Sequence, residues 1–129
     1  MGPEEFDRVV EEAVSGIPRR FRRRMRNLAL IVEPEPSARQ LASGGVRGPG
    51  TLLGLYEGRP LPLRSVFEPY AVPDRITIFQ GPHERLARNP AHLRQLVAET
   101  VWHEVAHYFG LNEREIHAVE RRRRPYGWR

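Results

Sequence analysis

The chain has 129 residues, a length that suits one domain with a single hydrophobic core. It contains no cysteine, which excludes a disulfide framework and a thiolate metal site, so any metal must be held by histidine and carboxylate side chains. The formal net charge is +5 and every basic residue is an arginine, a balance that permits nucleic-acid binding without indicating it.

No apolar run in the sequence approaches the length that spans a membrane. The first residues are acidic and amphipathic, and they lack the basic and apolar regions of a signal peptide. We therefore expect a cytoplasmic protein without a membrane partner. We also expect one domain over residues 1–129, in which residues 121–129 form a basic tail.

Two helices are predicted at the start of the chain. Apolar residues recur at helical spacing over residues 6–17, and Gly16 and Pro18 end that pattern. A short basic helix then begins at Pro18, with apolar residues along one side and arginines elsewhere. We interpret its arginine cluster, residues 19–26, as a solvated face rather than a nucleic-acid site.

Three strands are predicted in the middle of the chain. Residues 28–32 form a continuous apolar run, which is typical of a buried strand, and residues 51–56 form a second strand. Residues 75–79 alternate between the two faces and are predicted to be half-buried. The polar, glycine-rich residues 37–50 are predicted to be mostly loop, and residues 61–70 to be irregular.

The last third of the chain is predicted to be helical. One or two turns are expected over residues 82–88. A long helix over residues 90–109 starts with Asn89 as its N-cap and a proline at its first position. Asn112 caps a last helix over residues 113–123, which the following proline stops.

The long helix carries an HExxH motif formed by His103, Glu104 and His107. Residues four apart lie on one helical face, so the two imidazoles can bind one metal ion while Glu104 takes a proton from a water at that metal. Both histidines could instead be ordinary surface residues of an amphipathic helix. The helical context and the residues that follow favour the metal site.

A glycine turn after the motif can return an acid to the metal. Gly110 follows His107 by three residues, and Glu113 completes the pattern HExxHxxGxxE. Glu115, His117 and Glu120 are rival third ligands. Glu115 has the spacing of a capping box with the N-cap residue, which would occupy its carboxylate, so the spacing favours Glu113.

Other residues near the motif have less specific roles. Glu99 lies one turn before His103, where it could orient that imidazole or form a plain surface ion pair. Tyr56, Tyr70 and Tyr126 are candidates by residue type for stabilising an oxyanion.

The chain resembles the small bacterial zincin-like metallopeptidases called minimal zincins, over about residues 6–120. The segments that carry the resemblance are LGLYEG (53–58), RITIFQGP (75–82) and ETVWHEVAHYFGL (99–111). The resemblance implies an α+β, zincin-like fold in which a small mixed sheet packs on a metal-bearing helix, with N-terminal and C-terminal helices. It implies zinc at His103 and His107, the acid after the glycine turn as third ligand, and Glu104 as catalytic base. No methionine follows the motif, so the Met-turn of larger metzincins is absent.

These observations predict a hydrolase that cleaves peptide bonds with one zinc ion per chain, held by His103, His107 and Glu113. A peptide or protein substrate is expected to pair as an added strand along residues 75–79. The alternatives are a zincin-fold protein that binds metal with little catalysis, and a basic nucleic-acid-binding module. Metal content separates the second alternative from the others, and turnover separates the first.

Overall fold

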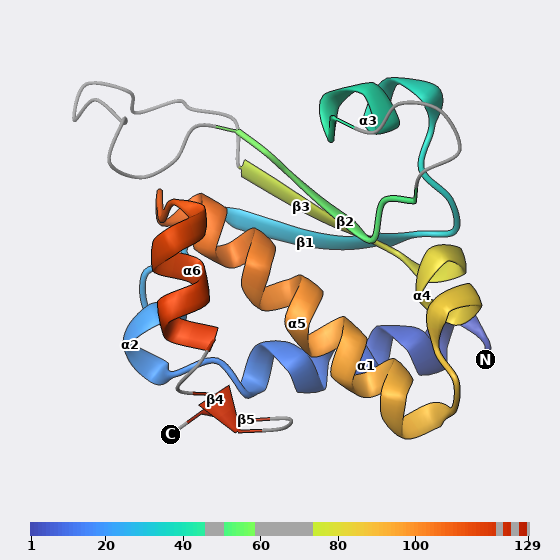
Figure 1. Cartoon of the computed structure of the whole chain (residues 1–129), viewed down its shortest axis with the longest axis horizontal. Helices are drawn as coiled ribbons and strands as arrows, with labels where there is room; N and C mark the ends of the chain where they lie inside the picture. The colour runs from blue at the N-terminus through green and yellow to red at the C-terminus, as the bar shows by residue number, and fades with distance from the viewer. Residues whose placement is uncertain (46–50, 59–73, 121–122, 125–126, 129) are drawn as a thin grey trace.

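The computed structural model of the chain describes residues 1–45, 51–58, 74–120, 123–124 and 127–128. Its described part is built around a three-stranded sheet with helices on both sides (Figure 1). The predicted irregular stretch at residues 61–70 lies outside the described residues.

The sheet is small and mixed. Its strands are β1 (Leu28–Glu33), β2 (Gly54–Glu57) and β3 (Asp74–Phe79), in the spatial order β1-β3-β2. β1 runs parallel to β3 and β2 runs antiparallel to it. The three predicted strands are therefore confirmed, although β2 begins at Gly54 rather than at residue 51.

Two burial predictions for the strands are wrong. β3 was expected to be half-buried, but Thr77 and Phe79 are as fully buried as Ile76 and Ile78, because β3 is the central strand. β1 was expected to be buried, yet it is an edge strand whose residues are half-buried or exposed. An apolar or alternating pattern does not say whether a strand lies at the centre or the edge of a sheet.

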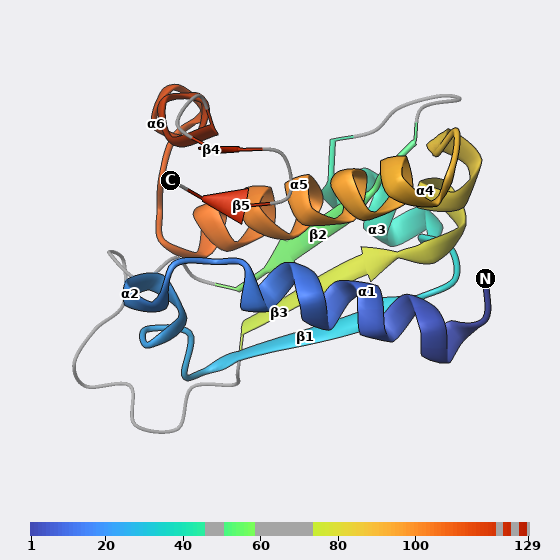
Figure 2. The ribbon, with the colours of Figure 1, turned by 90° about the horizontal axis from the view of Figure 1, so that it is seen from below.

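One face of the sheet packs on two long helices, α1 (Pro3–Ser15) and α5 (Pro90–Tyr108), which lie side by side (Figure 2). α5 starts where predicted, because the Asn89 side chain accepts a hydrogen bond of 2.8 Å from the N–H of His92. The core lies between these two helices and the sheet, and its largest members are Phe6, Ile76, Ile78, Trp102 and Ile116. Among the described residues, no helix is long and apolar enough to cross a membrane.

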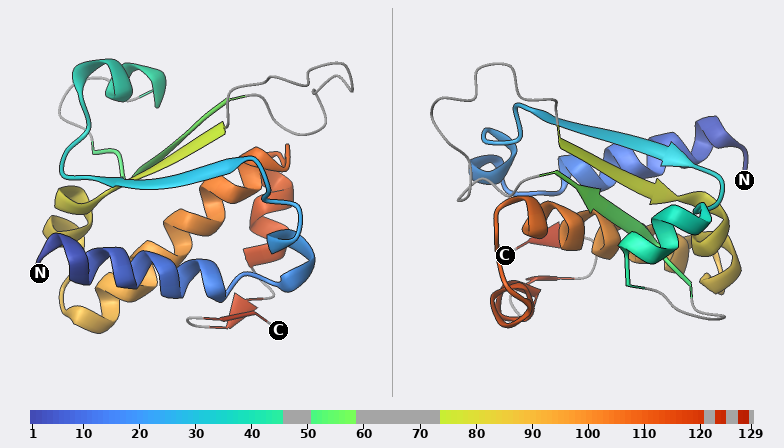
Figure 3. Two further views of the ribbon diagram at one scale, coloured as in Figure 1. Left: turned by 180° about the vertical axis from the view of Figure 1, so that it is seen from behind. Right: turned by 90° about the horizontal axis from the view of Figure 1, so that it is seen from above.

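Short helices extend this framework. α2 (Arg19–Arg22) and α4 (Gln80–Leu86) confirm the predicted short helices near residues 18 and 82. α3 (Ala38–Ser43) lies on the opposite side of the sheet from α1 and α5 (Figure 3). It corrects the prediction of mostly loop over residues 37–50 for residues 38–43, whereas residues 46–50 lie outside the described residues.

α3 is stabilised by two reciprocal hydrogen bonds at its N-terminus. The Ser37 hydroxyl accepts from the N–H of Gln40 at 3.1 Å, and the Gln40 side chain accepts from the N–H of Ser37 at 2.8 Å. This capping box satisfies two amides that would otherwise lack partners. The spacing of Ser37 and Gln40 is that of a capping box, but the glycines that follow favour the prediction of a loop.

The chain ends with α6 (Glu113–Glu120) and two short antiparallel strands, β4 (Arg123–Arg124) and β5 (Gly127–Trp128). The predicted last helix was too long, because Arg123 belongs to β4. Consecutive arginines repel one another on a helix, and the residue before Pro125 is driven toward extended backbone.

Candidate metal centre

The last turns of α5 bring three polar side chains together. His103, Glu104 and His107 each offer a ligand atom, and these atoms lie within 4.8 Å of one another. The two imidazole rings meet edge to face, with their centroids 4.7 Å apart. Their side chains are 33% and 35% exposed, so an ion or a substrate can reach both of them.

The predicted glycine turn is present directly after these residues. Gly110 has φ of 75°, a left-handed conformation that glycine adopts without strain. Its N–H donates to the carbonyl of His107 at 2.9 Å, and the N–H of Leu111 donates to the carbonyl of Ala106 at 3.0 Å. This pair of bonds is a Schellman motif, which ends α5 and reverses the chain toward α6.

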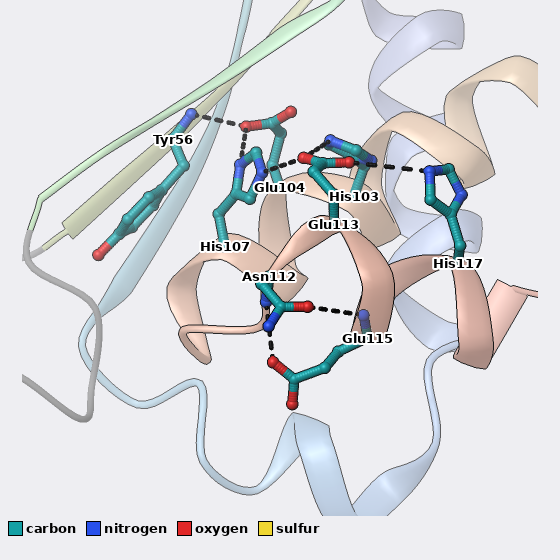
Figure 4. Close-up of polar contacts among 8 residues, drawn as sticks. All are labelled: Tyr56, His103, Glu104, His107, Asn112, Glu113, Glu115 and His117. Carbon is teal, nitrogen blue, oxygen red and sulfur yellow. Dashed lines mark hydrogen bonds and ion pairs between the residues drawn. The ribbon is translucent and has the colours of Figure 1, made fainter.

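The reversal brings Glu113, the first residue of α6, back over the two histidines (Figure 4). Its Oε1 atom lies 3.5 Å from Nε2 of His103 and 3.5 Å from Nε2 of His107. Zinc bonds of about 2.0–2.1 Å at tetrahedral angles put ligand atoms roughly 3.4 Å apart. The donor set and its spacing therefore fit a zinc ion with one position left for water or substrate.

The rivals of Glu113 are arranged differently. The Glu115 carboxylate accepts from the N–H of Asn112 at 3.0 Å, and the Asn112 side chain accepts from the N–H of Glu115 at 2.8 Å, as the capping-box spacing predicted. Nε2 of His117 lies 4.0 Å from the other carboxylate oxygen of Glu113, Oε2. The side chain of Glu120 lies outside the described residues.

Glu104 is buried beside the histidines, with 8% of its surface exposed. Its Oε1 atom accepts a hydrogen bond of 2.9 Å from the backbone N–H of Tyr56 in β2 and lies 3.3 Å from Nδ1 of His107. A proton on Nδ1 leaves Nε2 of His107 available as a metal ligand. Through this hydrogen bond Glu104 raises the pKa of His107 above its usual value, while burial opposes the rise.

A cavity of about 380 Å³ opens beside Glu104, between the start of β2 and α5. It extends from His103 toward the N-terminal half of α5. Its lining residues are Thr51, Leu52, Leu53, Gly54, Leu96, Glu99, Thr100, His103 and Glu104.

The strand beside this cavity is not the one that the sequence suggested. We expected residues 75–79 to offer a free edge to a substrate. β3 instead pairs with a strand on each side, so it has no free edge. The edge strand that borders the cavity is β2, which begins at Gly54.

Two further predictions concern residues around the motif. The hydroxyl of Tyr56 donates to Asp74 at 2.5 Å and points away from Glu104, so it is not placed to stabilise an oxyanion at this site (Figure 4). Tyr70 and Tyr126 lie outside the described residues. Glu99 lines the cavity and accepts a hydrogen bond of 3.2 Å from Gln95, and its role beside His103 stays a prediction.

Comparison with protein families adds a decisive finding. A model of the zincin-like metallopeptidase family matches residues 25–123. The chain belongs to this family. The match covers the whole sheet, α5 and α6, and therefore all the residues of the candidate metal centre. A comparison with curated proteins finds no match.

Two features of this zincin-like centre could not be predicted from the sequence. One is the backbone N–H of Tyr56, which contacts Glu104 across 48 positions of sequence. The other is the close approach of Gly54 to α5, where an added Cβ would lie 2.7 Å from Thr100 Cγ2. The segment LGLYEG carries part of the family resemblance, but a single sequence gives no sign that a strand amide meets a helix side chain.

Proposed function

We propose that this protein is a zinc-dependent peptidase whose ion is held by His103, His107 and Glu113. Supporting this ligand set, one carboxylate oxygen of Glu113 lies 3.5 Å from Nε2 of both histidines. Glu115 is a weaker candidate because its carboxylate already accepts the N–H of Asn112. Membership of the zincin-like metallopeptidase family supports peptide hydrolysis as the reaction.

Each residue of the centre has a distinct part in the proposed reaction. Bound zinc supplies Lewis acidity, which lowers the pKa of a water and polarises the carbonyl of the scissile bond. Glu104 takes the proton of the attacking water and passes it to the amine that leaves. The hydrogen bond from the N–H of Tyr56 holds one oxygen of Glu104, which leaves Oε2 as the oxygen for proton transfer.

The substrate is proposed to be an extended peptide bound in the cavity between β2 and α5. β2 is an edge strand, and a peptide can add to such an edge through backbone hydrogen bonds. The N–H of Tyr56 is already bonded to Glu104, so the pairing would involve Gly54 and residues 51–53.

Packing of α1 against α5 and the family match together support one domain over residues 1–129.

The test combines metal analysis with a cleavage assay. Protein purified without chelators should contain about one zinc per chain, because three protein ligands and one open position describe a single site. The same protein should cleave members of a peptide library, lose that activity when zinc is removed, and regain it when zinc is added.

The outcomes separate the alternatives. A protein that neither contains zinc nor binds added zinc contradicts the metal centre. A protein that holds one zinc and cleaves no peptide or unfolded protein is a metal-binding zincin without catalysis. Cleavage that survives complete zinc removal comes from a contaminant or from another site.

A further inference from the structure

Thr100 lies one helical turn before Glu104 on α5, and its side chain is held in one rotamer. Its Oγ1 atom lies 2.9 Å from Nε2 of His83 and 2.8 Å from the carbonyl of Leu96. Because Thr100 is β-branched, fixing Oγ1 also fixes the direction of its methyl group, Cγ2.

The partner that holds Thr100 is itself buried and hydrogen-bonded. His83 is fully buried, and its Nδ1 atom lies 2.7 Å from the carbonyl of Phe79. A carbonyl only accepts hydrogen bonds, so Nδ1 carries the proton. The single hydroxyl hydrogen of Thr100 is shared between Nε2 of the neutral ring and the carbonyl of Leu96. Burial lowers the pKa of His83, which favours that neutral ring.

The fixed methyl group of Thr100 meets β2 at Gly54. A Cβ atom on Gly54 would lie 2.7 Å from Thr100 Cγ2, 3.2 Å from Glu104 Cγ and 3.3 Å from the carbonyl of Thr77. These atoms enclose the position on the helix side and on the sheet side. Only glycine lets β2 lie this close to α5.

This close approach has a consequence two residues later along β2. Alternate residues of a strand present their backbone groups on the same side, so Tyr56 faces α5 as Gly54 does. The N–H of Tyr56 reaches Oε1 of Glu104 at 2.9 Å. A strand displaced away from Thr100 would carry this N–H away from the carboxylate.

We propose that Gly54 and Thr100 are positioning residues that set the Glu104 carboxylate through the N–H of Tyr56. His83 supports them by holding Thr100. The assignment of Glu104 as the general base rests on the proposed function, whereas the contact between β2 and α5 does not. A displacement of about 1 Å at a reacting group can lower a rate about 100-fold, so an error here should reduce kcat far more than zinc binding.

The experiment is a double-mutant cycle on Gly54→Ala and Thr100→Ser. Gly54→Ala should keep its zinc and lower kcat by about 10- to 100-fold, because the base moves and the metal ligands do not. Thr100→Ser removes Cγ2 and keeps Oγ1 for His83. In the double variant, kcat should return close to the value of Thr100→Ser alone.

A second readout makes the proposal independent of catalysis. Hydrogen exchange at the Tyr56 amide should be slow in the wild type, faster in Gly54→Ala and slow again in the double variant. If zinc-loaded wild type cleaves nothing, the proposed function fails, while this readout still decides whether Gly54 and Thr100 set the contact.

Two controls separate positioning from general destabilisation. Gly45→Ala strains a glycine with φ of 76° that has no atom within 4 Å of an added Cβ, so it should lower the melting temperature without changing kcat. Thr100→Val keeps the shape of the side chain and loses its hydrogen bond to His83. It tests the same contact if Gly54→Ala does not fold. It should speed exchange at the Tyr56 amide.

Three results would overturn the proposal. One is a Gly54→Ala variant whose kcat and whose exchange rate at the Tyr56 amide equal those of the wild type. Another is a loss that Thr100→Ser does not relieve in the double variant. The last is wild-type exchange at Tyr56 in Thr100→Val.

Discussion

Nε2 of His103 and Oε1 of Glu113 lie 3.5 Å apart, although nine residues and a helix end separate them in the chain. The Schellman motif at Gly110 makes this possible, because it reverses the chain within three residues. The same carboxylate oxygen lies at the same distance from His107. Glu113 is therefore the acid that α6 returns to the histidines of α5.

The first prediction concerns the third ligand. Glu113→Ala should weaken zinc binding by more than about 100-fold, since even the loss of a residue that only supports a ligand costs about 10- to 100-fold. Glu115→Ala should weaken it much less, because Glu115 caps α6. Competition with a zinc indicator measures both. A larger loss of zinc affinity in Glu120→Ala than in Glu113→Ala would mean that the third ligand is Glu120, in the later part of α6.

The second prediction concerns the glycine turn. Gly110→Ala should lower the free energy of unfolding by about 1–2 kcal/mol, because a side chain resists the left-handed conformation. It should also weaken zinc binding, since the strained turn carries Glu113. Gly45→Ala is the matched control, with φ of 76° against 75° at Gly110. Chemical denaturation and zinc titration are carried out on both variants. If Gly110→Ala and Gly45→Ala bind zinc with equal affinity, the turn at Gly110 does not contribute to zinc binding.

The third prediction concerns His83 and pH. Burial lowers the pKa of His83 in the folded protein below its usual value near 6.5, so the unfolded chain binds more protons in that range. The contribution of His83 to stability is thus full above about pH 6.5 and falls as the pH drops toward its folded pKa, by up to about 1.4 kcal/mol per pH unit.

The measurement for His83 is chemical denaturation of zinc-free wild type and His83→Gln at several pH values. Zinc-free protein is needed because zinc binding to histidines itself depends on pH. The contribution of His107, whose pKa is raised, has the opposite sign and is common to both proteins, so it cancels in the comparison. The stability advantage of the wild type should shrink between about pH 7 and about pH 5.5. An advantage that is constant over this range would mean that His83 keeps its ordinary pKa.

The fourth prediction concerns the arginines at positions 121–124. Replacing them with glutamine should leave peptide hydrolysis within about twofold, because we interpret them as a solvated cluster beyond the metal centre. The assay is kcat/KM on any peptide that the wild type cleaves. Specific, salt-sensitive binding of RNA or DNA that disappears with these substitutions would instead favour the nucleic-acid-binding alternative.

Much of the candidate site was predictable because its signals are local. The N-cap at Asn89, the reversal at Gly110 and the capping box of Asn112 and Glu115 each depend on residues within about five positions of one another. Side-chain chemistry and backbone preference act over that same range. These parts of α5 and α6 could therefore be expected from the sequence.

The rest depends on contacts between distant segments. The sequence does not say that β3 lies between β1 and β2, and for that reason its free edge was wrongly predicted. The contact of Gly54 with Thr100, and that of Tyr56 with Glu104, each join residues more than 40 positions apart. They arise from how closely β2 packs on α5, which no local pattern encodes.

The central claim is that Glu104 acts on water while other residues hold the metal, and the variant Glu104→Gln tests it most directly. Glutamine keeps the shape of the side chain and can still accept the N–H of Tyr56, but it cannot take a proton. Zinc content and kcat should be measured on the same preparation.

The account predicts about one zinc per chain in Glu104→Gln and a kcat at least about 100-fold below wild type, since a positioned general base contributes about 10²- to 10⁴-fold. Loss of zinc in this variant would make Glu104 a ligand or a structural support of the metal centre, and would contradict the claim that it acts only on water. Wild-type turnover with zinc retained would contradict the role of Glu104 as the base.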